Sequence, residues 1–236
     1  MDKVNPDQLQ ECYVLHRRDY SNTSLLLELF SRSQGRLPAL AKGAKRPNSG
    51  KAALLQPFQP LLIAVIGRGE VKTLTRAEPG PGGRIPRGKA LYCGFYLNEL
   101  VMRMLGRNDP HEQLFDHYRA AIAGLSEEPN LPRLLRRFEL RLLEQTGYAM
   151  ELQRDVGQDR PLHPDMRYHY DPERGPLPFL QGDAGFSVSG RTLLALAADR
   201  ELDTEGSREA KELMRLVLAR HLGDRPLKSR ELFRKP

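Results

Sequence analysis

The chain has 236 residues, of which 39% are hydrophobic and 28% charged, a composition typical of a globular protein with one large domain or two small ones. Its 37 lysines and arginines against 30 acidic residues give a net charge of +7, which indicates an anionic partner without identifying it. The sequence has no apolar run long enough to span a membrane, a polar start unlike a secretory signal, and only two cysteines, Cys12 and Cys93. We therefore expect a cytoplasmic protein without a disulfide framework or a four-cysteine metal site.

The first third of the chain has the pattern of a small β-barrel. Short apolar or alternating runs, separated by turn-forming residues, predict five strands at 11–17, 25–30, 36–41, 61–66 and 71–76. No convincing helix is predicted among them. Because the OB-fold is the five-stranded small barrel, we expect an OB-fold domain over residues 1–80.

The remainder of the chain has helical periodicity. A Pro/Gly-rich linker at 79–88 marks the expected domain boundary. Apolar stripes then predict helices at 90–105, 111–125, 132–146, 191–198 and 208–222, with Gly147 ending the third and Ser207 capping the last. The stretch 153–190, rich in Pro, Gly and Asp, predicts an irregular insertion with hairpins such as 166–170 and 179–188. The expected fold is thus α+β, an OB barrel followed by an all-α domain over 81–236.

The positive charge is concentrated in the predicted barrel. Residues 1–80 contain 12 cationic and 7 acidic residues, and residues 29–69 contain no acid at all. A solvated basic loop is one interpretation, but a one-signed run of this length favours a surface that binds a polyanion such as DNA. The candidate DNA-binding residues are Arg32, Arg36, Lys42, Lys45, Arg46 and Lys51.

Aromatic residues that could stack on bases are few in this region. The candidates are Tyr13, Tyr20, Phe30 and Phe58, and the two phenylalanines lie in apolar runs typical of a core. We therefore expect contacts with phosphates to outweigh stacking, so that both single- and double-stranded DNA bind.

Catalytic motifs are not found. The run 45–52 (KRPNSGKA) lacks the first glycine and the final hydroxyl residue of a phosphate-binding P-loop. His163, Asp165 and His169 are close in sequence, but their context favours surface residues of a hairpin over metal ligands. A metal-dependent nuclease needs a cluster of acids that the sequence does not offer. We therefore expect a protein that is not an enzyme and needs no cofactor.

A second candidate binding surface is the predicted helix at 133–144 (RLLRRFELRLLE). Its apolar stripe is flanked by Arg133, Arg136, Arg137 and Arg141. One interpretation is a solvated helix whose arginines pair with Glu139 and Glu144. The other is a groove with an arginine rim, suited to a short acidic peptide ending in an aromatic residue or a carboxylate.

Five segments in order resemble the RecO family of bacterial DNA repair and recombination mediators. They are 20–27 (YSNTSLLL), 41–43 with the basic loop that follows, 55–61 (LQPFQPL), 136–147 (RRFELRLLEQTG) and 227–233 (LKSRELF). The similarity spans nearly the whole chain, and the family has an OB domain followed by a helical domain. Many members also carry a four-cysteine zinc module in the region matching 153–190, which here has no cysteine. We therefore expect a zinc-free insertion held by packing.

The resemblance implies a nucleoid-associated protein that binds and anneals DNA without catalysis. With its partner RecR, and often RecF, it would load the recombinase RecA onto strands covered by single-strand-binding protein. The acidic tail of that protein, which ends in phenylalanine, would contact Arg136, with Arg137 and Leu135 as companions. An RNA-binding or ribosome-associated OB-fold protein is the alternative, because an electrostatic surface does not distinguish RNA from DNA.

Overall fold

The computed structural model describes residues 9–180, 183–223 and 225–233, which pack into two compact units. The first unit comprises residues 1–128 together with 227–236, and the second comprises residues 129–226. The first unit thus contains more than the barrel, because two helices and the C-terminal segment pack with it. In the part of the chain that the structure describes, no helix is long and apolar enough to cross a membrane.

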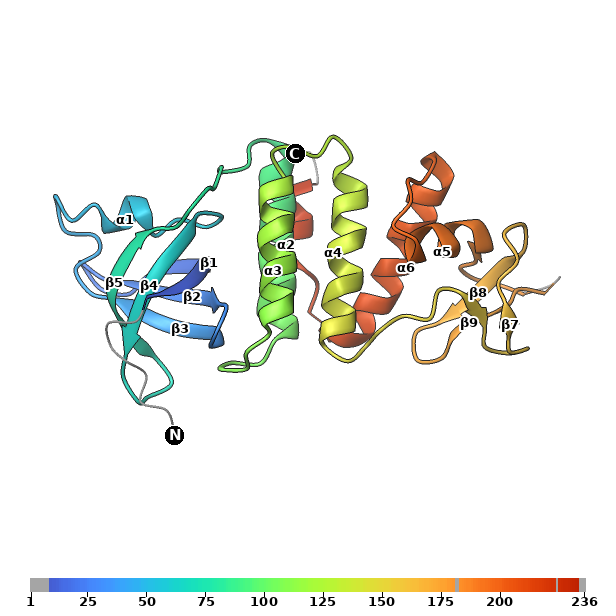
Figure 1. Cartoon of the computed structure of the whole chain (residues 1–236), viewed down its shortest axis with the longest axis horizontal. Coiled ribbons are helices and arrows are strands. Elements are labelled where there is room, and N and C mark those ends of the chain that lie inside the picture. Colours follow the sequence, from blue (N-terminus) through green and yellow to red (C-terminus); the bar gives the residue numbers. More distant parts are fainter. Residues whose placement is uncertain (1–8, 181–182, 224, 234–236) are drawn as a thin grey trace. The chain divides into compact units, whose positions relative to one another are not determined.

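The barrel is the expected five-stranded one. Strands β1 (Gln10–Asp19), β2 (Leu25–Ser31), β3 (Gly35–Ala41), β4 (Pro60–Ile66) and β5 (Lys72–Pro79) close in the order β1-β2-β3-β5-β4, as Figure 1 shows. All neighbours are antiparallel except β3 and β5, which pair in parallel at Ala39 and Lys72. This arrangement confirms the predicted OB-type barrel followed by helices. The prediction of no helix among the strands was wrong, because the short α1 (Lys51–Leu54) lies between β3 and β4.

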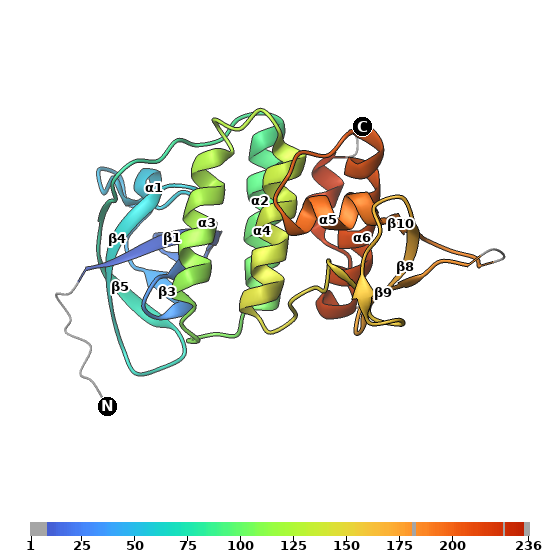
Figure 2. The same ribbon diagram turned by 45° about the vertical axis from the view of Figure 1, so that its right-hand side comes forward.

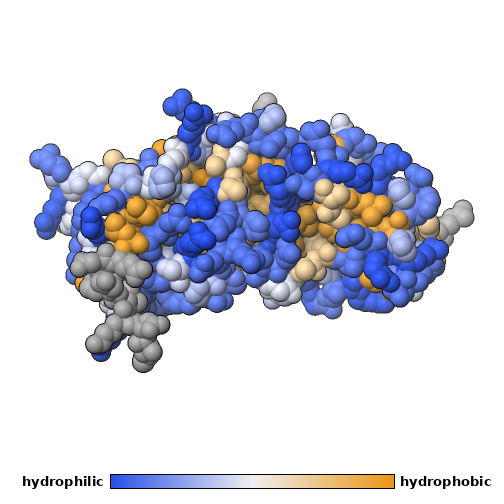
Figure 3. Space-filling model, in the orientation of Figure 1, coloured by the Kyte–Doolittle hydropathy of each residue, from blue (hydrophilic) through white to orange (hydrophobic). Residues whose placement is uncertain are grey.

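Alternation along the strands puts one set of side chains inside the barrel. The interior is built from small and branched apolar residues, among them Val14, Leu27, Leu29, Leu37 and Ile63, all fully buried. Figure 3 shows that the outer surface is mostly hydrophilic on the face drawn, with apolar areas over β4 and β5 and over the helix α6 of the second unit.

Helix α3 (Glu112–Gly124) covers the outer face of β1 and β2, and it lies beside the barrel in both Figures 1 and 2. Tyr13 and Phe30 on the strands meet Phe115 and Tyr118 on the helix, with ring centroids 5.2–5.7 Å apart in tilted or edge-on pairs. The Tyr118 hydroxyl donates to Asn98 Oδ1 at 2.6 Å. This aromatic cluster explains why two of the four candidate stacking residues are buried.

Helix α2 (Lys89–Met104) anchors the C-terminal segment to the first unit. The 3₁₀ helix η1 (Lys228–Phe233) packs against α2. Its first two backbone N–H groups, those of Lys228 and Ser229, donate hydrogen bonds to the Glu99 carboxylate of α2 at 3.0 and 2.8 Å. Tyr92 and Phe233 add an edge-on ring contact at 5.8 Å. A segment about 130 residues away in sequence thereby belongs to the first unit.

The second unit contains helices α4 (Leu131–Gln145), α5 (Gly190–Ala197) and α6 (Thr204–Leu222). Gly147 ends α4 as expected, with a φ of 84° and a hydrogen bond from the Tyr148 N–H to the Leu143 carbonyl at 2.8 Å. The expected cap of α6 was wrong: the helix begins four residues earlier than predicted, and Asp203 caps it by accepting from the Gly206 N–H at 2.7 Å.

The insertion forms small sheets. Strands β8 (Arg167–Asp171), β9 (Gly175–Pro178) and β10 (Val188–Ser189) form one sheet in the order β10-β8-β9, and β6 (Arg154–Asp155) pairs with β7 (Arg160–Pro161). The predicted strand at 166–170 is confirmed, but its hairpin partner is β9. The predicted hairpin at 179–188 was wrong, since β10 is the only strand among its described residues. Prolines 176 and 178 concealed the strand signal of β9.

Candidate nucleic-acid interface

The connection from β3 to α1 is a compact loop that displays cations. Gly43, Asn48 and Gly50 have φ values of 67°, 67° and 64°, a left-handed conformation that favours glycine and asparagine. Ala44 is fully buried and accepts a hydrogen bond from the Ser49 hydroxyl at 2.7 Å, which fixes the loop against the barrel. The sequence therefore folds locally so that the apolar position points inward and the basic positions point outward.

Three of the predicted DNA-binding residues on this loop are available to a ligand. Lys42 and Arg46 are exposed and Lys51 is partly exposed. Among the residues that the structure describes, none of the three has an acidic partner. Their charges are therefore not neutralised within the protein.

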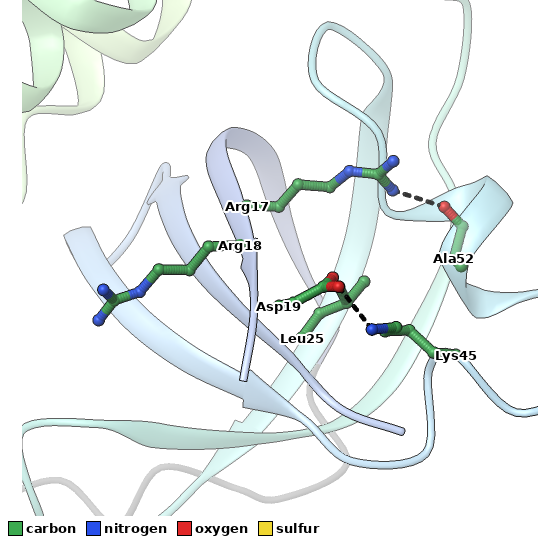
Figure 4. A pocket seen from close by; sticks show the side chains of 6 residues that line it. All are labelled: Arg17, Arg18, Asp19, Leu25, Lys45 and Ala52. Atoms are coloured by element: carbon green, nitrogen blue, oxygen red, sulfur yellow. Dashed lines mark hydrogen bonds and ion pairs between the residues drawn. The ribbon is translucent and has the colours of Figure 1, made fainter. Parts of the chain in front are cut away.

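A pocket lies beside this loop, at the end of β1. It is lined by Arg17, Arg18, Asp19, Leu25, Lys45 and Ala52, which Figure 4 shows as sticks. Lys45 Nζ lies 2.6 Å from Asp19 Oδ2, so this predicted DNA-binding cation is paired. The Arg17 guanidinium donates to the Ala52 carbonyl at 2.8 Å and so caps the C-terminal end of α1. Arg18 points to the opposite side of the strand, as Figure 4 shows, because consecutive strand residues alternate.

Arg32, directly after β2, lies apart from this loop and pocket. Its guanidinium forms ion pairs with Glu11 on β1 at 3.3 Å and with Asp116 on α3 at 3.0 Å. The hydrogen bond that Arg32 donates to Glu11 and the charge of Asp116 raise the pKa of Arg32. Arg119 contacts the same two acids, so Arg32 belongs to a network that ties α3 to the barrel.

Arg36 on β3 is also occupied within the first unit. Its Nε donates to the Leu105 carbonyl at 3.1 Å, and its guanidinium lies 3.6 Å from Glu28. Only 17% of its side chain is exposed, and burial lowers its pKa despite the neighbouring Glu28. Of the six predicted DNA-binding cations, Arg32, Arg36 and Lys45 thus have acidic partners, whereas Lys42, Arg46 and Lys51 on the loop have none among the described residues.

The four candidate aromatic residues differ in their exposure to solvent. Tyr13, Phe30 and Phe58 are buried, with exposed fractions of 4% or less, whereas Tyr20 is 57% exposed in the turn that follows β1. Reasoning from sequence missed Arg17 and Arg18, although two adjacent cations before a polar turn were visible in the chain. Only the structure shows that the end of β1, which carries these two arginines, lines a pocket together with Lys45 of the β3–α1 loop.

The second predicted surface lies on α4. Arg136 is held by Glu139, with 2.5 Å between its guanidinium and the Oε1 of a fully buried carboxylate, and only 12% of its side chain is exposed. Arg137 is 45% exposed and lies 3.4 Å from Asp199, which also pairs with Arg133 at 3.2 Å. Leu135 is partly exposed on the same helix. The arginines thus line one helix, but acids of the second unit already contact them.

Comparisons with known proteins cover almost the whole chain. A family model described as "Recombination protein O N terminal" matches residues 7–80, and one described as "Recombination protein O C terminal" matches residues 86–231. A DNA repair protein RecO of Methylococcus capsulatus is 49% identical over 96% of this chain and 93% of its own length. Proteins of the same name from Nitrosospira multiformis and Haemophilus influenzae are 44% and 42% identical, each over 96% of this chain and 95% of their own length.

The chain belongs to the recombination protein O family. The gap between the two family matches falls inside the Pro/Gly-rich linker at 79–88, whereas the packing boundary lies at residues 128 and 129. Helices α2 and α3 therefore belong to the C-terminal family match but pack in the same unit as the barrel.

In this RecO-family chain the insertion is built without a cysteine cluster. Among the described residues no group of three or more His, Cys, Asp or Glu side chains is placed to hold a metal ion. Of the three residues considered as ligands, Asp165 pairs with Arg191 at 2.8 Å, and His163 Nδ1 accepts from the Asp165 N–H at 3.3 Å. Both cysteines of the chain are buried, and neither forms a disulfide.

Hydrogen bonds donated to two aspartates by backbone N–H groups shape the turns of the insertion. The buried Asp155 accepts from the N–H groups of Gly157 and Gln158 at 3.0 and 3.2 Å. Asp171 accepts in the same way from Glu173 and Arg174 at 2.8 and 3.0 Å. These bonds hold the pKa of Asp171 below its ordinary value. Each aspartate thus organises the turn after its strand.

Buried tyrosines and one glutamate complete the insertion. The rings of Tyr168 and Tyr170 are buried, and the Tyr170 hydroxyl donates to the Glu151 carbonyl at 3.2 Å. Glu209 of α6 accepts from the Ser189 hydroxyl at 2.8 Å and the Thr192 hydroxyl at 2.7 Å, and it pairs with Arg167 at 2.8 Å. Packing of buried rings and a buried polar cluster therefore both hold the described part of the insertion.

Proposed function

We propose that this protein is a DNA-binding, strand-annealing mediator of recombinational repair that acts without catalysis. It helps RecR, and RecF where present, to load RecA onto single-stranded DNA covered by single-strand-binding protein. The single observation that carries this proposal is the group of unneutralised cations on the β3–α1 loop of the barrel, in a chain of the RecO family. The contact with DNA is assigned to Lys42, Arg46 and Lys51, with Lys45 and Arg18 at the neighbouring pocket.

The chemistry of this surface supports binding without a base code. Flexible ammonium and guanidinium groups neutralise phosphates and release counterions, which favours any DNA strand regardless of sequence. A protein that holds two complementary strands through their phosphates leaves their bases free to pair. Neutralising the strands also lowers the repulsion between them, which supports annealing.

A salt titration tests this assignment. We expect the triple variant Lys42→Ala, Arg46→Ala and Lys51→Ala to bind a single-stranded oligonucleotide more weakly and to reduce the slope of log K against log salt by about 2, at roughly 0.7 per lost phosphate contact. The matched control removes three exposed cations from α6 in the second unit, by Arg208→Ala, Lys211→Ala and Arg215→Ala. Equal slopes for both triple variants would refute the loop as the DNA site. An RNA strand of the same length, added as competitor, tests the alternative of an RNA-binding protein.

The tail of single-strand-binding protein is assigned to α4, with Arg136 as anchor and Arg137 and Leu135 as companions. Charge supports this assignment, because a carboxylate-rich peptide complements a helix that carries four arginines, and its terminal aromatic ring suits the apolar side chains between them. We expect Arg136→Ala to abolish binding of a labelled tail peptide and to leave the affinity for naked DNA unchanged. Equal loss of both affinities would show that tail and DNA share one site.

Annealing of complementary strands coated with single-strand-binding protein joins the two assignments. We expect the wild-type protein to anneal coated strands only when the coating protein retains its tail. The triple loop variant should fail with both coated and naked strands, whereas Arg136→Ala should fail only with coated ones. Annealing by Arg136→Ala at the wild-type rate on coated strands would contradict the tail site.

A further inference from the structure

Tyr20 has an unusual environment for an aromatic side chain of the barrel. It is 57% exposed, while the other aromatic residues in the described part of the barrel, Tyr13, Phe30 and Phe58, are buried. Within the residues that the structure describes, the Tyr20 side chain makes no hydrogen bond, ion pair or ring contact. Exposure of a large aromatic ring to water is unfavourable and has no packing role here.

Backbone hydrogen bonds hold Tyr20 next to the cationic loop. The Tyr20 N–H donates to the Ser24 carbonyl at 3.1 Å, which closes the β1–β2 turn. The Lys45 N–H donates to the Thr23 carbonyl at 2.9 Å, which ties this turn to the β3–α1 loop. Tyr20 directly follows Asp19, which lines the pocket shown in Figure 4. The backbone of Tyr20 is therefore fixed in a turn that is bonded to the cationic loop at Lys45 and that directly follows Arg18 and Asp19 in sequence, and the ring that it carries is exposed.

We propose that Tyr20 is a base-stacking residue for single-stranded DNA, which it binds at the edge of this pocket. The inference rests on the proposed DNA-binding function and names a contact within it. Every base has a π face, so one tyrosine adds affinity for any sequence while the neighbouring cations contact the phosphates. Bases within a duplex are already stacked on each other, so the contact with Tyr20 favours single strands. The barrel thereby gains a preference for single strands that cations alone do not provide.

Binding of three oligonucleotide probes to two variants tests this inference. The probes are an oligothymidylate, an abasic strand with the same number of phosphates, and a duplex of the same length. We expect Tyr20→Ala to weaken binding of oligothymidylate by about 5- to 150-fold, which corresponds to the affinity that stacking of one base on an aromatic side chain typically adds. Binding of the abasic strand and the duplex should change less than about 2-fold. Tyr20→Phe keeps the ring and should bind all three probes like the wild type.

Controls separate this inference from the proposed function. If the triple loop variant loses affinity for all three probes and Tyr20→Ala loses none, the loop is the DNA site and the stacking role is wrong. If neither variant loses affinity, the proposed DNA site itself is wrong. Tyr148→Ala, which removes a tyrosine of 50% exposure from the second unit, should bind all three probes normally. Equal losses by Tyr20→Ala on the abasic strand and on oligothymidylate would also overturn the stacking role.

Photochemical cross-linking gives a second, independent readout. A single-stranded probe containing 5-iodouracil cross-links to an aromatic ring that stacks on the modified base. We expect the cross-linked peptide to contain Tyr20 and the yield to fall to background in Tyr20→Ala. A cross-link to another residue, with Tyr20 unmodified, would contradict the proposal even if affinities change.

Discussion

Lys45 Nζ lies 2.6 Å from Asp19 Oδ2, so a cation of the proposed DNA surface is held by an acid at the end of β1. The Asp19 side chain is 72% exposed, and a pair open to water is only weakly stabilising. A phosphate can therefore replace the carboxylate at Lys45. On the proposed DNA surface Asp19 would compete with DNA, because it neutralises Lys45 and repels phosphates.

Asp19→Asn should therefore strengthen DNA binding. The substitution removes the competing charge but keeps the size of the side chain, so we expect about 2- to 5-fold tighter binding at low salt, with a smaller gain as salt rises. Fluorescence anisotropy with a labelled single strand measures the effect. The control, Glu212→Gln on the exposed face of α6, changes the net charge by the same amount in the second unit. Equal gains by both variants would mean that only net charge matters.

Arg36→Ala should change stability rather than DNA binding. The variant loses the hydrogen bond to the Leu105 carbonyl and leaves Glu28 with Arg107 alone, at 2.6 Å. We expect the free energy of unfolding to fall by about 1–2 kcal/mol, the usual cost of removing a partly buried hydrogen-bonded partner. Urea denaturation, monitored by hydrogen exchange of peptides from the barrel, measures this change in the free energy of unfolding. Lys42→Ala is the control and should show the reverse, with weaker DNA binding and unchanged stability.

The strands of the barrel were predictable because their patterns are local. Alternating side chains and glycine-containing turns located all five strands to within three residues at each end. Helix α1 has only four residues, fewer than a periodic pattern needs, and it was missed. The start of α6 was missed for another reason. Thr204 and Gly206 are weak helix formers that gave no helical signal, and the Asp203 side chain caps this first turn.

The candidate site was only partly predictable, because charge counts do not reveal partners. The acid-free run 29–69 drew attention to the loop, but it contained Arg32 and Arg36 as well, whose charges are paired within the first unit. The partner of Arg32 on α3 is Asp116, 84 residues away in sequence, and only the tertiary fold brings the two together. Conversely, Tyr20 was one of four aromatic candidates until burial of the other three distinguished it.

Asp199→Asn should strengthen binding of the acidic tail if Arg137 belongs to its site. Asp199 now contacts Arg137 and Arg133, and asparagine removes its charge while tolerating the φ of 46° at this position. We expect a 2- to 5-fold higher affinity for a labelled tail peptide by anisotropy. Asp165→Asn, which breaks the exposed pair with Arg191 in the same unit, should leave it unchanged. Unchanged affinity in Asp199→Asn would exclude Arg137 from the tail site.

Glu209→Gln should make the stability of the insertion less sensitive to acid. Burial raises the pKa of Glu209, but hydrogen bonds from Thr192, Ser189 and Arg167 outweigh burial and hold the pKa below its ordinary value of 4.5. A lowered pKa means that the stabilisation is complete above pH 4.5 and is lost as the pH falls through the pKa of the folded state. The wild-type second unit should therefore lose stability in acid more steeply than the variant.

At pH 7 we expect Glu209→Gln to lower the free energy of unfolding by about 1–3 kcal/mol, because an amide cannot accept all the hydrogen bonds that the carboxylate accepts. Hydrogen exchange of peptides from β8 and β10 at pH 7 and at pH 4 measures both effects in the second unit. The difference between wild type and variant should shrink at the lower pH, and Glu212→Gln on the exposed face of α6 should match the wild type at both. A difference that is the same at both pH values would show that the charge of Glu209 does not stabilise the cluster, and that the cost comes from packing alone.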